Sequence, residues 1–159
     1  MLAKLALATG QLYEAASELG ESLGIGSIYG RVLGAFLQGR ATYYKALARV
    51  RKAADSLSAG KFGEEISFLN EATTLLSRCK ESKRLMDTAT CNDLDTLAGV
   101  VVRSLERAIK DNSVIYHETV PAASSLPDIG QAIVARPTAF NEPKIEEFGR
   151  PILARLGKA

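Results

Sequence analysis

Few residues of this chain carry side chains that catalyse reactions or bind metals. The chain has two cysteines, Cys79 and Cys91, and a single histidine, His117. A thiol nucleophile needs a base beside its sulfur, and nothing in the spacing of these residues brings either cysteine to the imidazole. Two cysteines and one histidine also fall short of the four ligands of a usual zinc site. The sequence therefore predicts neither a cysteine catalyst nor a zinc centre.

Carboxylates and glycines do not complete a catalytic site either. Glu64-Glu65 stands at the expected start of a helix, where negative charge favours the helix dipole. Asp93-Leu94-Asp95 lacks the further oxygen ligands of a calcium loop. Gly24-Ile25-Gly26 lacks the strand and helix that flank a dinucleotide-binding loop. We expect a chain that is not an enzyme, with no cofactor, no metal and no small-molecule substrate.

Composition narrows the class of protein. The 159 residues are 47% hydrophobic and 24% charged, which is typical of one folded domain. The net charge of +2 is too small to attract nucleic acid over the whole surface, and no nucleic-acid recognition motif is present. No apolar run has the length of a membrane-spanning helix, and we find no signal peptide. Two cysteines do not make a disulfide framework, so we expect a soluble protein of a reducing, intracellular compartment.

Apolar residues recur every three or four positions over the first hundred residues, which predicts amphipathic helices. We expect an all-α fold whose antiparallel helices span about 2–23, 27–58, 62–85 and 92–111. The first helix is expected to bury one stripe, formed by Leu5, Leu12, Ala16, Leu19 and Leu23. The stretch from Tyr43 to Leu76 has the length of one tetratricopeptide repeat, so we expect a tetratricopeptide-like helix array.

Local signals predict where helices begin and end. Gly60 follows the second helix as a terminating glycine does, and Asn92-Asp93 is an N-cap signal for the fourth helix. In the third helix, Phe68 and Leu75 lie off the main apolar stripe, which suggests neighbours on two sides.

From residue 112 to residue 143, several prolines exclude a long helix. We therefore expect an extended strap across the helices at 112–143 and a short helix at 144–156.

Three sequence blocks follow one another in a specific order. They are KFGEEISFLNEA at residues 61–72, KDNSVIYHETVP at 110–121 and LPDIGQAIVARP at 126–137. Together they resemble the C-terminal half of a Bro domain, the module of Alix-like endosomal adaptors and their fungal relatives. Residues 1–16 and 38–47 are also similar to Bro helices, so the resemblance covers nearly the whole chain.

A complete Bro domain is more than twice as long and begins with a small β-sheet and further helices, which this sequence lacks. We therefore interpret residues 1–159 as a partial Bro domain. Two explanations remain open: a fragment or truncated gene model, and a natural half-length protein.

The resemblance implies a protein-interaction scaffold of the endosomal sorting (ESCRT) pathway, cytoplasmic and peripheral on endosomes. Bro domains bind the C-terminal amphipathic helix of an ESCRT-III subunit on an apolar patch, a helix-in-groove arrangement. Met1 and Leu5 match the last two apolar residues of that patch. The other patch residues would lie upstream, so we expect weak binding or none. The resemblance leaves three pathways open: Alix-like adaptors, fungal pH-signalling scaffolds and Rho-binding relatives.

Two candidate residues have a structural interpretation beside the functional one. Leu5 shares a helical stripe with Leu12, so it either packs in the core or belongs to the partner patch. Tyr116 matches a tyrosine that some Bro domains offer to a Src-type kinase. Alternatively, Tyr116 is buried and anchors the strap onto the fourth helix. The two roles conflict, because a buried hydroxyl is phosphorylated only after local opening.

Basic residues of the second helix suggest an alternative function. Lys45, Arg49 and Lys52 lie on one helical face with Arg40 nearby, and we call these four residues the basic strip. Such a strip attracts anionic lipid head groups, and Bro domains are thought to present a basic surface to membranes. The chain would then be a peripheral membrane-binding module. The other interpretation of the basic strip is a solvated polar face.

Overall fold

The computed structural model describes residues 1–22, 24–79 and 82–132, and the side chains of residues 25–30 and 82 lie outside this description. Over the described residues the chain is all-α, so the predicted fold class is confirmed. The main helices are α1 (Leu2–Ser22), α2 (Ile25–Ser58), α3 (Phe62–Arg78) and α4 (Thr88–Asp111). The short helical turns are η1 (Ser82–Leu85), η2 (Asn112–Tyr116) and η3 (Ala123–Ser125). The tetratricopeptide-like packing stays a prediction.

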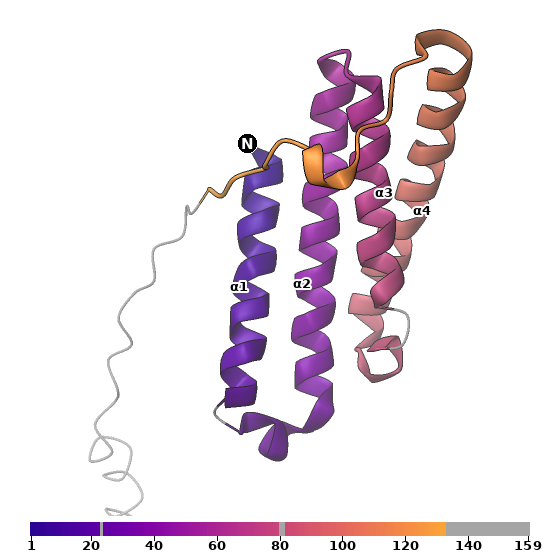
Figure 1. The fold of residues 1–159 in the computed structure, drawn as a ribbon. Coiled ribbons are helices and arrows are strands. Elements are labelled where there is room, and N and C mark those ends of the chain that lie inside the picture. Colours follow the sequence, from indigo (N-terminus) through magenta and orange to yellow (C-terminus); the bar gives the residue numbers. More distant parts are fainter. Residues whose placement is uncertain (23, 80–81, 133–159) are drawn as a thin grey trace, which may run out of the picture.

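The four main helices stand side by side, each running antiparallel to the one before it (Figure 1). α2 is the longest and packs against α1, α3 and α4. Small side chains let neighbouring helices approach α2 from several directions. The buried residues of α2 accordingly include Ala35, Ala41, Ala46, Ala48 and Ala53, none of them more than 6% exposed.

Two clusters of buried side chains form the core. In the first, Phe68 and Leu69 of α3 pack with alanines of α1 and α2. In the second, Leu76 of α3 packs with Leu94 and Val101 of α4. Phe68 is only 1% exposed although it lies off the main stripe of α3. α3 is therefore covered on two sides, as its sequence suggests.

Gly60 ends α2 in the predicted way. Its φ is 72°, a left-handed conformation that favours a residue without a Cβ. The backbone N–H groups of Gly60 and Lys61 donate to the carbonyls of Leu57 (3.0 Å) and Ser56 (2.9 Å). This pair of hydrogen bonds is the Schellman pattern, which satisfies carbonyls at the end of a helix. The chain can therefore reverse at once into α3.

α4 begins earlier than the sequence predicts. Its N-cap is Asp87 rather than Asn92-Asp93, and its carboxylate accepts the backbone N–H of Thr90 at 2.9 Å. This hydrogen bond satisfies one of the free N–H groups of the first helical turn. Asp93 lies within the helix instead and pairs with Arg40 of α2. The predicted start near residue 92 is therefore wrong by about one helical turn.

Other boundaries also differ from prediction. α3 ends at Arg78 rather than at 85, and Ser82–Leu85 forms a separate turn of 3₁₀ helix. Residues 112–116, predicted as the start of the strap, continue α4 as a π-helical turn. The expected helix at 144–156, like residues 133–143 of the expected strap, lies outside the described residues.

We call residues 117–132 the strap, which crosses α3 and α2 and ends beside α1 (Figure 1, orange). Near its start, the Gly63 N–H donates to the Glu118 carboxylate at 2.8 Å, and the Ser67 hydroxyl donates to the Pro121 carbonyl at 2.8 Å. Near its end, Ile129 is 6% exposed and packs in the first core cluster. The described part of the strap is therefore held on the helices at both ends.

Glu65 is a buried charge between α3 and α4. Its side chain is 4% exposed and accepts a hydrogen bond from the Arg107 guanidinium of α4. Burial raises the pKa of the Glu65 carboxyl, and the hydrogen bond and positive charge of Arg107 oppose this rise. A carboxylate removed from water is costly unless a cation compensates it. Arg107 therefore ties α4 to α3 close to the strap.

We predict that Gly63→Ala destabilises the protein. An added Cβ would collide with the carbonyl oxygen of Thr119 in the strap, so the strap has to shift and strain its hydrogen bonds to Gly63 and Ser67. We expect a loss of about 1–3 kcal/mol, typical of overpacking. Gly34→Ala in α2 is the matched control, because nothing lies within 4 Å of its added Cβ. It should gain up to about 1 kcal/mol from helix propensity. Urea unfolding measures both, and equal effects would contradict the prediction.

Asp87→Asn tests the cap of α4. The hydrogen bonds from the Thr90 hydroxyl and backbone N–H hold the pKa of Asp87 below its ordinary value. A lowered pKa stabilises the fold above about pH 4, the ordinary aspartate value, and this contribution disappears as the pH falls through the folded-state pKa. Asparagine keeps the acceptor oxygen but does not titrate. Between about pH 4 and pH 2, the unfolding free energy of the parent chain should therefore fall more steeply than that of Asp87→Asn. Parallel curves would disprove this role.

Candidate protein-interaction surface

α1 presents most of its large apolar side chains to solvent. Met1, Leu12 and Leu19 are 75%, 64% and 59% exposed, and Leu5 is half-buried. We call these four residues the α1 stripe. The prediction that Leu12, Ala16 and Leu19 lie on a buried stripe is therefore wrong, since Ala16 is exposed as well. For the half-buried Leu5, the core and the partner-patch interpretations both stay predictions. Leu23 lies outside the described residues.

The opposite face of α1 carries mostly small residues and is the face that packs on α2. Ala3, Ala6 and Gly10 are buried, and so is Leu7, which belongs to the first core cluster. A Cβ on Gly10 would lie 2.9 Å from the Lys45 Cγ and 3.0 Å from the Ala41 carbonyl oxygen. A larger side chain would therefore force the two helices apart. The spacing of these small residues was visible in the sequence, but the leucines at seven-residue steps gave the stronger periodic signal.

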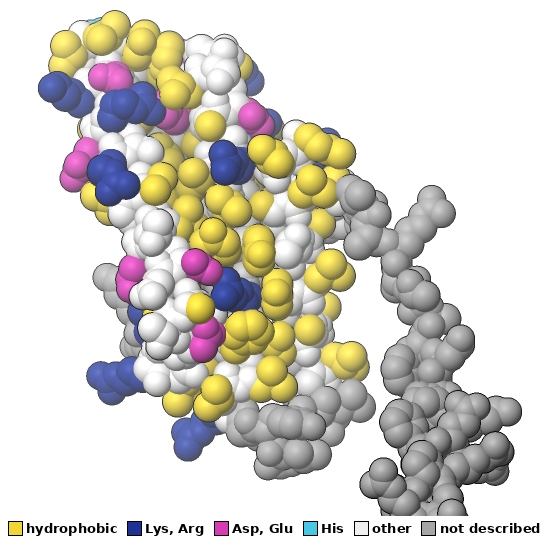
Figure 2. Space-filling model, turned by 180° about the vertical axis from the view of Figure 1, so that it is seen from behind, with side chains coloured by type: hydrophobic (Ala, Val, Ile, Leu, Met, Phe, Trp, Pro, Cys, Tyr) yellow, Lys and Arg dark blue, Asp and Glu magenta, His cyan; other side chains and the backbone are white. Residues whose placement is uncertain are grey.

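Aromatic rings join α1 to α2 beside the stripe. Tyr13 stacks on Tyr44 with ring centroids 5.7 Å apart and meets Phe36 edge-on at 6.4 Å. Both geometries are favourable for aromatic pairs. Figure 2 shows that hydrophobic side chains gather on the face turned away from the strap, over α1 and α2. This face therefore offers an apolar surface on a rigid helix pair.

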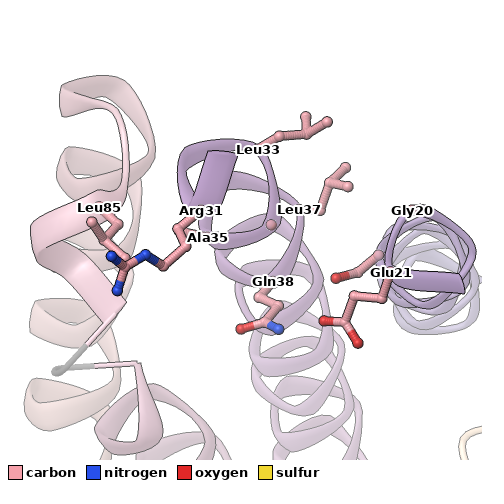
Figure 3. A pocket seen from close by; sticks show the side chains of 10 residues that line it. Gly20, Glu21, Arg31, Leu33, Ala35, Leu37, Gln38 and Leu85 are labelled. Atoms are coloured by element: carbon pink, nitrogen blue, oxygen red, sulfur yellow. The ribbon is translucent and has the colours of Figure 1, made fainter. Parts of the chain in front are cut away.

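A hollow of about 310 Å³ lies between α1 and α2, at the end remote from the strap (Figure 3). Glu21 of α1 and Gln38 of α2 extend toward one another across it, whereas Leu33 and Leu37 project toward the surface. The Glu21 and Gln38 side chains are exposed. In a typical small-molecule site, by contrast, the few polar groups lie inside a largely enclosed apolar cavity and are not exposed to solvent. The hollow therefore does not indicate a substrate site.

Tyr116 is 42% exposed, and its ring stacks on Phe62 of α3 with centroids 3.4 Å apart. The interpretation of Tyr116 as a buried anchor on the fourth helix is therefore wrong, because solvent reaches the ring and its aromatic partner belongs to α3. The next residue, His117, has a φ of 54° and turns the chain out of the helix. The stack positions the start of the strap. A phosphotyrosine role for Tyr116 stays a prediction.

Three residues of the basic strip form ion pairs, each with a different helix. The pairs are Arg40 with Asp93 of α4 (2.6 Å), Lys45 with Glu14 of α1 (2.5 Å) and Arg49 with Glu71 of α3 (3.2 Å). The hydrogen bond to Asp93 raises the pKa of Arg40. Lys52 has no ion pair with a described residue. The basic strip thus links helices rather than forming one free cationic face.

The cysteines and the histidine lie at opposite ends of α4. Cys79 is buried and Cys91 is half-buried near its start, whereas His117 follows its other end. Helix rise alone separates residues 91 and 111 by about 30 Å, so no thiol–imidazole pair forms. Among the described residues, no cluster of three His, Cys, Asp or Glu side chains is arranged to hold a metal ion. Nor does any helix in this part of the chain combine the length and apolar character needed to cross a bilayer.

The match to a known family covers the surface just described. Residues 1–157 fit the model of the BRO1-like domain family. The chain belongs to this family. The predicted Bro-domain resemblance is therefore confirmed, and the α1 stripe, the strap and Tyr116 all lie within the matched residues.

The curated relatives that the chain matches are much longer than the chain itself. The chain is 33% identical over 127 residues to the pH-response regulator protein RIM20 of Yarrowia lipolytica, covering 72% of the chain and 16% of the relative. It is 33% identical over 117 residues to the programmed cell death 6-interacting protein of Mus musculus, covering 70% and 12%. It is 33% identical over 90 residues to the palA/RIM20 protein of Aspergillus oryzae, covering 57% and 11%. The chain thus spans between about a tenth and a sixth of these proteins.

We predict that this domain binds anionic vesicles weakly, because acidic partners already neutralise most of the basic strip. Vesicles with about one-third phosphatidylserine attract each free cation near the surface by about 1 kcal/mol. The triple variant Glu14→Gln, Glu71→Gln and Asp93→Asn releases three cations and should sediment with the vesicles far more strongly at low salt. The same variant at high salt is the control. Strong, salt-sensitive sedimentation of the parent chain would contradict the prediction.

Proposed function

We propose that this chain is part of a protein-interaction scaffold of the endosomal sorting pathway. In this proposal it helps to bind the C-terminal amphipathic helix of an ESCRT-III subunit. The observation that carries the proposal is the exposed Met1 beside the half-buried Leu5 at the start of the α1 stripe, on a face that α2 does not cover. An amphipathic helix binds by laying its apolar side chains on such a surface. Membership of the BRO1-like family supports this assignment.

The size of the contact limits the affinity. Burial of one Met or Leu side chain contributes roughly 1.5–3 kcal/mol, whereas association costs at least about 4 kcal/mol in lost motional freedom. Met1 and Leu5 together therefore leave little net binding free energy. We therefore expect binding weaker than about −4 kcal/mol, which corresponds to a dissociation constant above about 1 mM. Further apolar contacts outside this pair would be needed for tight binding.

The names of the fungal relatives suggest a second pathway in which the same surface acts. Relatives from Aspergillus oryzae and Yarrowia lipolytica are named as pH-response regulators. A scaffold in a pH-response pathway is therefore the alternative to a role in cargo sorting. In both pathways the chain acts by contacting another protein rather than by chemistry on a substrate. Both are compatible with a cytoplasmic protein that its partner recruits to endosomes.

Leu5→Asp tests the proposed contact. A carboxylate at this position would be buried against the apolar face of the partner helix, so binding should weaken at least tenfold. An NMR titration with a synthetic ESCRT-III C-terminal helix detects contacts in the millimolar range. Val102→Asp on α4 is the matched control, since Val102 is also exposed, at 50%, and lies outside α1.

For the parent chain we expect shift changes in the first turns of α1, and Val102→Asp should behave in the same way. Either of two results would overturn the proposal. One is the absence of shift changes at millimolar peptide. The other is an equal affinity of Leu5→Asp and the parent chain.

A further inference from the structure

The hollow between α1 and α2 opens where these two helices pack less closely. At Gly10, an added Cβ would lie 2.9 Å from the Lys45 Cγ of α2. At Gly20 and Gly34, which both line the hollow, no described atom of another element lies within 4 Å of an added Cβ. The helix pair is therefore tight near the middle of α1 and leaves space nearer its end.

A second hollow, of about 410 Å³, adjoins the first and extends to α3. Ser17 and Glu21 of α1 and Gln38 of α2 line both hollows. We call these three residues the polar junction. Ser17 follows Gly10 by seven residues, so it lies on the face of α1 that meets α2. The polar junction is therefore separate from the α1 stripe and from the proposed ESCRT-III contact.

The side chains of the polar junction lack partners. None of them forms a hydrogen bond or an ion pair with a described residue. Ser17 is only 7% exposed, and a buried hydroxyl without a partner loses the hydrogen bonds that it made to water. No fully enclosed side-chain oxygen of the described residues lacks a partner, so the Ser17 oxygen remains open to the hollows. A ligand there would supply the hydrogen bond that the fold does not.

Negative charge gathers beside the polar junction. Glu18 lines the second hollow and, like Glu21, has no ion pair with a described residue. Three cations also line the hollows. Arg31 extends away from Glu21 (Figure 3), Lys45 is already paired with α1, and Arg78 of α3 lines only the second hollow. Carboxylates without partners on the α1 side therefore favour a ligand with positive charge.

From these observations we infer that the polar junction binds an arginine side chain of a partner peptide. A guanidinium has five N–H donors in one plane and no acceptor. The Glu21 carboxylate, the Gln38 amide oxygen and the Ser17 hydroxyl oxygen are acceptors that reach it from two helices. The methylene stem of the arginine passes Leu33 and Leu37, which line the first hollow and project toward the surface. The compact ammonium group of a lysine has only three donors and satisfies these acceptors less well.

A blocked Ala-Arg-Ala peptide is the probe for this site. In an NMR titration of the isotope-labelled chain, it should shift the signals of Ser17, Glu21 and Gln38. The citrulline peptide has nearly the same shape without the charge, and it should bind about two- to fivefold more weakly, as expected for the loss of a partly exposed ion pair. The lysine peptide should also bind more weakly. The absence of shifts with millimolar arginine peptide, or an equal affinity for either of the other peptides, would overturn the inference.

Ser17→Ala separates binding from folding. It removes a hydroxyl that has no partner in the fold and introduces a better helix former, so the free energy of unfolding in urea should stay equal or rise. Affinity for the arginine peptide should fall about tenfold, because a hydrogen bond to a charged group is lost. Ser104→Ala on α4, also at a helical position, is the control and should bind like the parent chain. An unchanged affinity of Ser17→Ala would overturn the inference.

Glu21→Gln tests the charge and should weaken binding about two- to fivefold. Glu106→Gln makes the same change in net charge at an exposed position of α4 and should leave the affinity unchanged. Equal weakening by both variants would overturn the inference, since the attraction would then come from net charge alone. If Arg78 of the same chain fills the polar junction in solution, Arg78→Ala binds the peptide and the parent chain does not. That result would overturn peptide binding by the parent chain.

Discussion

The close approach of α1 to α2 is the contact on which the rest of the surface depends. Gly10 lies so near the Ala41 carbonyl and the aliphatic side chain of Lys45 that an added Cβ would fit only if one of the two helices shifted. The face of α1 that carries Ala3, Ala6, Leu7 and Gly10 therefore meets α2. Because a helix has opposite faces, burying Ala3 and Ala6 necessarily turns Leu12 and Leu19 toward solvent. The exposed stripe is thus a geometric consequence of tight hairpin packing.

At the other side of the molecule, the strap also depends on close packing against a glycine. It passes directly over Gly63, where a side chain would meet the Thr119 carbonyl. Its hydrogen bonds use the Gly63 N–H, one of the N–H groups left free at the start of α3, and the Ser67 hydroxyl. With Ile129 buried near α1, the strap connects the last helix of the array to the first. The helices that carry the proposed interaction surface are therefore held together by the strap.

Charged residues serve mainly as links between helices. Arg40, Lys45 and Arg49 look like one cationic face in the sequence, yet each finds a carboxylate on a different neighbour of α2. A central helix is surrounded by partners, so its polar side chains meet other elements before they meet solvent. Glu65 and Arg107 make the corresponding link between α3 and α4. The ion pairs thus argue against a free basic membrane face, and the exposed apolar residues support the proposed contact on α1.

The sequence by itself determined the helical class, the end of α2 at Gly60, the two-sided burial of α3 and the family, because these depend on local periodicity, backbone conformation and short motifs. Only the tertiary structure decided which face of α1 is buried, which partners the basic strip meets and how far Tyr116 is exposed. Periodicity gives the side chains that share a face, but not the neighbour that face meets. That choice rests on how closely two backbones can approach, and here Gly10 and the alanines offered a closer fit than Leu5, Leu12 and Leu19.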